Sequence, residues 1–186
     1  AGKHLPDWQG VSWQLGETYN TGIGQGYVLT TPLQLAVMTA RLANGGKKVN
    51  PRLVRSVTGQ TLEGAVLPPA DDEAANRDIG VSQSALKTVL SGMNKVVNGP
   101  RGSARAAKIQ VEGWEMAGKT GTAQVRRISR KERIEGVRKS DEKPWEERDH
   151  ALFVGYAPYN DPRYAVSVIV EHGGSGSGAA APIARD

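Results

Sequence analysis

The chain has 186 residues and no cysteine, so it can form no disulfide bond and no zinc site that depends on thiolates. Its formal net charge is +5, but its basic residues are not interleaved with aromatic ones, which argues against a surface for DNA or RNA. The longest apolar runs, 151–157 and 165–170, have the length of strands and cannot span a bilayer.

Residues 1–30 are rich in glycine and are expected to form loops and turns. Gly22, Gly24 and Gly26 alternate, which raises the question of a phosphate-binding loop. The spacing matches neither a dinucleotide fingerprint nor a P-loop, and no lysine follows in the required place. We therefore interpret this stretch as a tight loop in which one backbone approaches another.

Two helices are predicted from capping residues and apolar periodicity. The first begins at Thr31 and Pro32, which suit the N-cap and the first helical position, and ends at the Asn-Gly-Gly of 44–46. Its broad apolar face predicts that this helix is largely buried. The second begins at Ser82 and ends at 98–100, where Asn, Gly and Pro follow one another. Its apolar stripe consists of Leu86, Val89, Leu90, Met93, Val96 and Val97.

Four strands are predicted from runs of apolar and β-branched residues, at 51–57, 114–125, 150–157 and 163–172. The last two are joined by a short, turn-rich connection, so they should pair as an antiparallel hairpin. A polar connection, 58–79, leads from the first strand to the second helix.

The remaining segments differ in composition. A charged segment, 126–149, separates the second and third strands and is interpreted as a solvated loop, although binding of an anionic substrate or a partner protein stays open. The glycine-rich run after 172 is expected to be flexible and to lead into the start of a helix. Together the elements predict one α/β (α+β) domain over 1–186, with an antiparallel sheet flanked by helices and strand 114–125 at its accessible edge.

The strand at 114–125 contains Lys119, Thr120, Gly121 and Thr122 in sequence. Because strand side chains alternate, the two threonines should project from one face and the lysine from the other. Gly121 allows another extended backbone to lie close, which suits a peptide bound by strand addition with its carboxylate on the hydroxyls. A backbone N–H near Thr122 is a candidate donor to a developing oxyanion. An ordinary surface strand with a solvated lysine has the same pattern, so these residues alone leave both interpretations open.

Lys-Thr-Gly is the third motif of the penicillin-recognising serine acyltransferases, where it accompanies S-x-x-K and S-x-N. Further blocks of the chain, "IGQGYVLTTPLQLAVMTARLANGGK", "AGKTGTAQV", "DHALFVGYAP" and "YAVSVIVEHGG", resemble the C-terminal half of the transpeptidase domain of class B penicillin-binding proteins. The resemblance is strongest to the branch of this family that serves cell elongation and cell shape in rod-shaped bacteria. It covers residues 22–186, with the motifs in family order.

This resemblance implies a peptidoglycan D,D-transpeptidase, in which a serine attacks the D-Ala–D-Ala bond of a stem peptide and the acyl group passes to a neighbouring amine. β-Lactam antibiotics imitate the dipeptide and leave a slow acyl-enzyme. Lys119 would supply positive charge and hydrogen bonds to the motif serines. Thr120, Gly121 and Thr122 would bind the substrate or drug carboxylate, and the Thr122 N–H would form half of the oxyanion hole. No cofactor or metal is implied.

The resemblance also implies a cellular setting. The parent protein would lie at the periplasmic face of the bacterial inner membrane, held by an anchor outside this segment. Its partners would be the elongation glycosyltransferase and scaffold proteins of the cell wall machinery.

The nucleophile is not found in this chain. S-x-N is absent, and S-x-x-K occurs twice, at Ser84–Lys87 and at Ser140–Lys143. Ser84 fits an N-terminal helix cap, and the second match lies in the charged segment just before a proline. We therefore expect that the nucleophile precedes Ala1, that the last helix continues past Asp186, and that this chain alone is not acylated by penicillin.

Two alternatives remain from the sequence. One is a serine β-lactamase or D,D-carboxypeptidase relative, against which the block "GQGYVLTTPLQLA" argues. The other is a non-catalytic remnant that only binds a peptide carboxylate. The histidines favour neither, because His4, His150 and His172 lack the spacing of a metal site, and His150 and His172 are interpreted as structural residues near the groove.

Overall fold

The computed structural model describes residues 13–26, 28–51, 77–126 and 128–186. The strand predicted at 51–57 and most of the polar connection after it therefore lie outside the described residues. The chain divides into two compact units, Ala1–Thr31 and Pro32–Asp186, and each is described by itself. Across the described ranges, no helix is both long enough and apolar enough to cross a membrane.

The first unit contains helix α1 (Leu15–Gly22), where loops and turns were predicted. The prediction was wrong because α1 buries none of its residues and so carries no apolar stripe. Local bonds hold it instead: the Gln14 N–H donates to Glu17 Oε2 at 2.6 Å, and Trp13 Nε1 donates to Thr18 Oγ1 at 2.7 Å. A tight turn follows the helix, with Gly24 and Gly26 at positive φ. The predicted close approach of another backbone is absent among the described residues, because a Cβ on Gly24 would meet nothing within 4 Å.

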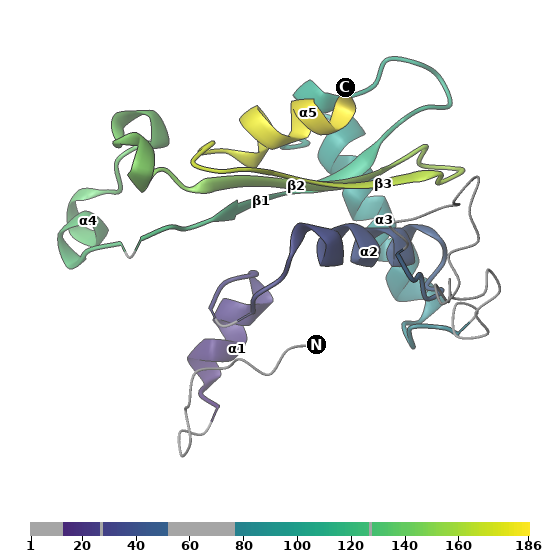
Figure 1. Cartoon of the computed structure of the whole chain (residues 1–186), viewed down its shortest axis with the longest axis horizontal. Coiled ribbons are helices and arrows are strands. Elements are labelled where there is room, and N and C mark those ends of the chain that lie inside the picture. The colour runs from purple at the N-terminus through teal and green to yellow at the C-terminus, as the bar shows by residue number, and fades with distance from the viewer. Residues whose placement is uncertain (1–12, 27, 52–76, 127) are drawn as a thin grey trace, which may run out of the picture. The chain divides into compact units, whose positions relative to one another are not determined.

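The second unit is built on a three-stranded sheet with the order β1-β2-β3 (Figure 1). Its strands are β1 (Ala117–Ala123), β2 (His150–Ala157) and β3 (Tyr164–Val170), and both pairings are antiparallel. The predicted hairpin is confirmed as β2 and β3. Within the described residues no strand pairs with the outer edge of β1, so the motif strand lies at the sheet edge as predicted. The predicted fold class, an antiparallel sheet flanked by helices, is likewise confirmed.

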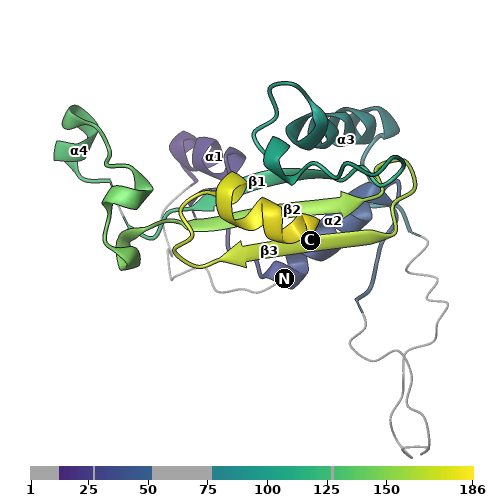
Figure 2. The same cartoon turned by 90° about the horizontal axis from the view of Figure 1, so that it is seen from above.

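Different helices cover the two faces of the sheet (Figures 1 and 2). One face carries the short helix α5 (Ala181–Arg185) and the π-helical turn before it, η5 (Gly176–Ala180). Helix α2 (Pro32–Ala43) lies on the opposite face, and α3 (Gln83–Asn98) packs against β1. The main core forms on the α5 side, and its buried residues include Phe153, Met116, Val97, Ala104, Ala151 and Ala181. A smaller cluster of Met93, Ala117 and Tyr156 forms on the other side.

Both predicted helices are present, but one expectation about them fails. Helix α3 begins after Ser82, whose Oγ accepts the Ala85 N–H at 3.3 Å, and it ends at Gly99 as predicted. Helix α2 was expected to be largely buried, whereas Thr39 is its one buried residue, and Leu33 and Met38 are 51% and 43% exposed. The reason is that α2 packs against the sheet with one face, whereas no described residue covers Leu33 and Met38 fully.

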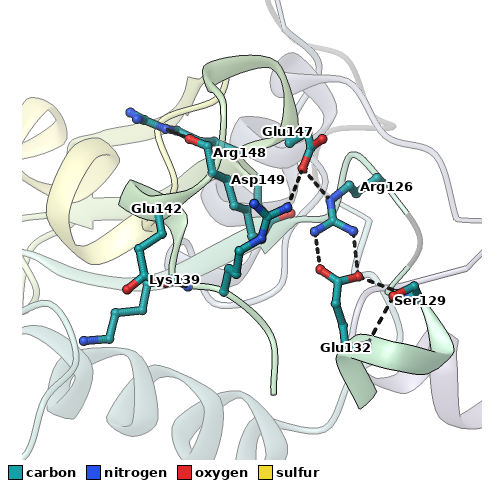
Figure 3. A network of polar contacts seen from close by, with 10 residues as sticks. Arg126, Ser129, Glu132, Lys139, Glu142, Glu147, Arg148 and Asp149 are labelled. Carbon is teal, nitrogen blue, oxygen red and sulfur yellow. Dashed lines mark hydrogen bonds and ion pairs between the residues drawn. The ribbon is translucent and has the colours of Figure 1, made fainter. Parts of the chain in front are cut away.

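The charged segment between β1 and β2 is more regular than the solvated loop that was predicted. It contains helix α4 (Arg130–Glu135) and two 3₁₀ turns, η3 (Ser140–Glu142) and η4 (Trp145–Glu147). Figure 3 shows the reason: one arginine, Arg126, joins two parts of the segment. It bonds both carboxylate oxygens of Glu132 in α4, and its Nε lies 3.3 Å from Glu147 in η4.

The glycine-rich run after β3 is packed against the sheet, which corrects the prediction that it is flexible. Gly176 is buried, and a Cβ built on it would lie only 2.5 Å from the carbonyl oxygen of Gly121 in β1. Ala180 and Ala181 are fully buried in the main core. Because a side chain has no room at position 176, the run is tightly packed and leads directly into α5, the helix start that the sequence predicted.

Candidate active site

The four residues of the motif lie in the middle of β1, and the pairing register with β2 shows on which face of the sheet each side chain lies. Lys119 is opposite Val154, and Thr120 is opposite the buried Phe153. The ring of Phe153 also lies against Gly118, two residues before Thr120, so Thr120 and Thr122 share the α5 face of the sheet. Lys119 faces the side of α2 and α3, as the strand period predicts. Thr122 and Lys119 are exposed and Thr120 is half-buried, so all three polar side chains are accessible.

The N-terminal end of β1 is firmly held, and this fixes the motif in space. Asn98 at the end of α3 donates through Nδ2 to the Met116 carbonyl at 2.9 Å. The Tyr159 N–H, beyond β2, donates to the Glu115 carbonyl at 2.7 Å. A Cβ on Gly118 would lie 2.6 Å from the Val154 carbonyl oxygen, so glycine is required there for the close approach of the two strands. The accessible residues 119–122 therefore extend from a rigid base.

Lys119 lines an apolar groove of about 430 Å³. The groove is lined by Met38 and Leu42 from α2, by Val89, Met93 and Val96 from α3, and by Val154 from β2. Among the described residues that line it, Lys119 is the one polar side chain. Its Nζ donates to the Thr120 carbonyl at 2.8 Å, which holds the ammonium group close to the motif strand. The site thus combines a positive charge with an apolar surface large enough for another element of structure.

Thr120 has a neighbour that the sequence did not reveal. Ser103, in the loop between α3 and β1, places its Oγ 3.3 Å from Thr120 Oγ1. The two residues are 17 positions apart, so no local pattern connects them. The one signal in the sequence was the small-residue run around Gly102 and Ala104, which is typical of a loop that packs closely on its neighbours.

The contacts of the two S-x-x-K matches are with residues outside the Lys-Thr-Gly motif. Ser84 lies in the first turn of α3, where its hydroxyl is 3.1 Å from Ser82 Oγ. The first groove-lining residue of α3, Val89, follows Ser84 by five residues, or about 7.5 Å along the helix axis. Ser140 is packed under Gly174, and the buried Lys143 has its Nζ 3.6 Å from Asp149 Oδ2, so this lysine is engaged elsewhere.

The two described histidines join the charged segment to the end of β3. The His172 N–H donates to Nδ1 of His150 at 2.9 Å. Nδ1 of His172 lies 3.0 Å from the Arg148 carbonyl, and because a carbonyl only accepts, this nitrogen carries the proton. The Trp145 ring lies 4.3 Å from that of His172. This arrangement agrees with a structural role, and the described residues contain no cluster of three or more potential metal ligands.

Electrostatics fix the charged segment next to the motif strand (Figure 3). The hydrogen bonds from Arg126 are the main reason why the pKa of the Glu132 carboxyl lies far below its usual range, and the Ser129 N–H at 3.0 Å lowers it further. The same pairing raises the pKa of Arg126 above its usual value. Arg126 follows the end of β1 by three residues, so this network continues from the motif strand.

The fold and the site together define a class of protein. In this class, the open edge of an antiparallel sheet carries Lys-Thr-Gly, and helices pack on both faces of the sheet. Residues 2–186 match the family described as the penicillin binding protein transpeptidase domain, and the chain belongs to that family. Among curated relatives, it is 41% identical over 176 residues to the peptidoglycan D,D-transpeptidase MrdA of Haemophilus influenzae. That alignment covers 93% of this chain and 25% of the relative, so the chain spans about a quarter of the relative's length.

Solved structures of penicillin-binding protein 2 (PBP2) are similar in fold and sequence. PBP2 of Pseudomonas aeruginosa, in complex with WCK 5153, is 42% identical with a TM-score of 0.70, over 93% of this chain and 33% of that one. PBP2 of Helicobacter pylori, in complex with MreC, is 28% identical with a TM-score of 0.69, over 94% of this chain and 27% of that one. The resemblance to the elongation branch of class B penicillin-binding proteins is therefore confirmed.

Proposed function

We propose that this chain is the C-terminal part of a peptidoglycan D,D-transpeptidase that cross-links stem peptides through a serine acyl-enzyme and is acylated by β-lactams. The observation that carries this proposal is the open edge of β1. There Thr120 and Thr122 are accessible on one face, and Lys119 lines the groove on the other. Family membership supports the reaction class, and the accessibility of these side chains supports the proposed roles.

Each group at this edge suits one requirement of acyl transfer from a peptide acid. Hydroxyl groups donate to a carboxylate, so Thr120 and Thr122 would hold the terminal acid of D-Ala–D-Ala or the carboxylate of a β-lactam. A backbone N–H that points to the reacting carbonyl stabilises the oxyanion as it forms, and this role is assigned to Thr122. The Lys119 ammonium would stabilise anionic groups beside the strand and orient the hydroxyls that take part in proton transfer.

The apolar groove supports the view that another segment of a longer polypeptide packs next to Lys119. Met38 of α2 and Val89 of α3 line the groove and are 43% and 45% exposed. Exposed apolar side chains that gather in one groove are typical of a surface that another segment covers. We propose that this segment brings the nucleophilic serine to the mouth of the groove. The chain covers only 25% of the H. influenzae relative, which leaves ample length for it.

The setting follows from the same proposal. A transpeptidase of this branch would act at the periplasmic face of the inner membrane and would work with a glycosyltransferase and scaffold proteins. The H. pylori relative was solved together with MreC, which supports a scaffold partner of that kind.

A fluorescent penicillin tests the proposal on matched polypeptides. The longer polypeptide that includes the upstream region should be labelled, and the 186-residue chain alone should not be. Lys119→Ala should reduce the labelling rate of the longer form by about 10²-fold or more, because it removes the ammonium group that orients the hydroxyls for proton transfer. Ser84→Ala should leave it unchanged. Labelling of the 186-residue chain that disappears with Ser84→Ala would contradict the proposal.

A further inference from the structure

We propose that Ser103 is a positioning residue for carboxylate recognition. Its hydroxyl donates to Thr120 Oγ1 and thereby directs the Thr120 proton toward the acid group of the substrate or β-lactam. This inference rests on the proposed function, because it takes the carboxylate ligand of Thr120 from there. It adds a residue outside the Lys-Thr-Gly motif, from a different part of the fold.

The position of Ser103 is set by its two neighbours. A Cβ on Gly102 would lie 2.6 Å from the Lys95 carbonyl oxygen, so the backbone there is pressed onto the last turn of α3. Ala104 is fully buried, and its N–H donates to the Val96 carbonyl at 3.0 Å. The residue between them cannot shift without disturbing the packing at the end of α3.

The same helix end is bonded to β1, so the two hydroxyls belong to one rigid assembly. Asn98 of α3 bonds the Met116 carbonyl, four residues before Thr120. Ser103 itself is exposed, and Thr120 is half-buried. An exposed serine in a loop is usually a solvated turn residue. Here, however, the backbone on both sides is fixed, and the hydroxyl is directed at the motif.

The direction of the hydrogen bonds follows from the chemistry of the ligand. A carboxylate only accepts, so the Thr120 hydroxyl must donate to it. The Thr120 oxygen can then accept a bond from Ser103, which is an exposed residue. At 3.3 Å the pair is longer than the usual 2.5–3.0 Å for two hydroxyls. A carboxylate that polarises the Thr120 hydroxyl strengthens its capacity to accept, because successive hydrogen bonds reinforce one another.

The test compares two probes that differ only in the group that Thr120 recognises. Acylation by benzylpenicillin and by its methyl ester, which lacks the anionic carboxylate, is measured as a second-order rate constant on the longer polypeptide. Ser103→Ala should lower the rate constant for benzylpenicillin about two- to tenfold, the range expected for one hydrogen bond. Ser103→Ala should leave the rate constant for the ester unchanged. Ser103→Thr, which keeps a hydroxyl at this position, should have the parent rate constant for benzylpenicillin. Ser84→Ala is the control and should affect neither probe.

A double-mutant cycle separates action through Thr120 from a general effect. In a Thr120→Val background, Ser103→Ala should have no further effect on benzylpenicillin. The inference is overturned if Ser103→Ala matches the parent with benzylpenicillin, if it slows both probes equally, or if its effect persists without the Thr120 hydroxyl. A parent polypeptide that benzylpenicillin does not acylate at all overturns the proposed function and, with it, this inference. If benzylpenicillin acylates the parent polypeptide and the Ser103→Ala variant at the same rate, only the role of Ser103 is overturned.

Discussion

Replacement of Gly176 by alanine should push the C-terminal turn away from the motif strand. The added Cβ would clash with the Leu152 carbonyl oxygen of β2 and would lie 2.5 Å from the Gly121 carbonyl oxygen of β1. Both atoms belong to the backbone of a paired strand, so neither can move aside as a flexible side chain would. Backbone strain adds nothing, because Gly176 does not have a positive φ. The effect is therefore purely steric.

The magnitude follows from the cost of overpacking a buried site, about 1–3 kcal/mol. For a chain of this size, 1 kcal/mol shifts Tm by about 2–4 °C, so the expected decrease is roughly 2–12 °C. Thermal unfolding followed by tryptophan fluorescence measures it. Amide hydrogen exchange should also become faster in β1, because the turn covers the strand.

The control lies two residues away in the same turn. A Cβ on Gly178 would have Ser175 as its nearest neighbour, at 3.9 Å, which is an ordinary contact. Gly178→Ala should therefore change the free energy of unfolding by no more than about 0.5 kcal/mol in the destabilising direction. If Gly176→Ala unfolds at the same temperature as the parent and Gly178→Ala, the close packing of this turn on Gly121 is refuted.

Two further predictions concern the groove and the charged segment. Val89→Asp should change the free energy of unfolding of the 186-residue chain by no more than about 0.5 kcal/mol, because the side chain is exposed. In the longer polypeptide the groove would be covered, so the same substitution should destabilise it by about 1–3 kcal/mol. Val111→Asp, exposed and outside the groove, is the control for thermal unfolding, and equal effects of Val89→Asp on both polypeptides would contradict the idea. Because the folded state lowers the pKa of Glu132, its pairing with Arg126 stabilises the segment above the ordinary pKa of about 4.3 and is lost progressively as the pH falls below it. The protection factors of the α4 amides, which are corrected for the intrinsic pH dependence of exchange, should therefore fall at low pH in the parent, and the same fall in Glu132→Gln would show that another group is responsible.

The parts of the fold that the sequence predicted are those set by local rules. Ser82 and Gly99 bound α3 because capping and termination depend on a few neighbouring residues. The hairpin of β2 and β3 followed from two apolar runs and a short turn. The edge position of β1 followed from the interpretation of its motif as a site for strand addition of a peptide, which requires an open edge.

The features that the sequence did not predict depend on contacts between distant residues. Gly176 looked like part of a flexible linker because its neighbour, Gly121, is 55 positions away. The pairing of Ser103 with Thr120 needed the end of α3 to lie beside β1. Helix α2 has an apolar surface that the described residues leave open, so its composition overestimated its burial. The roles of Lys119, Thr120, Gly121 and Thr122 in catalysis and binding stay predictions.

In the proposed function, the open edge of β1 binds a peptide through its terminal carboxylate. An NMR titration of this chain with a peptide ending in D-Ala–D-Ala tests it most directly, with the C-terminal amide of the same peptide as the matched ligand. The free acid should shift the backbone amide signals of Thr120, Gly121 and Thr122 most strongly, and the amidated peptide should not. Equal shifts with both peptides, or shifts confined to other parts of the chain, would contradict the claim.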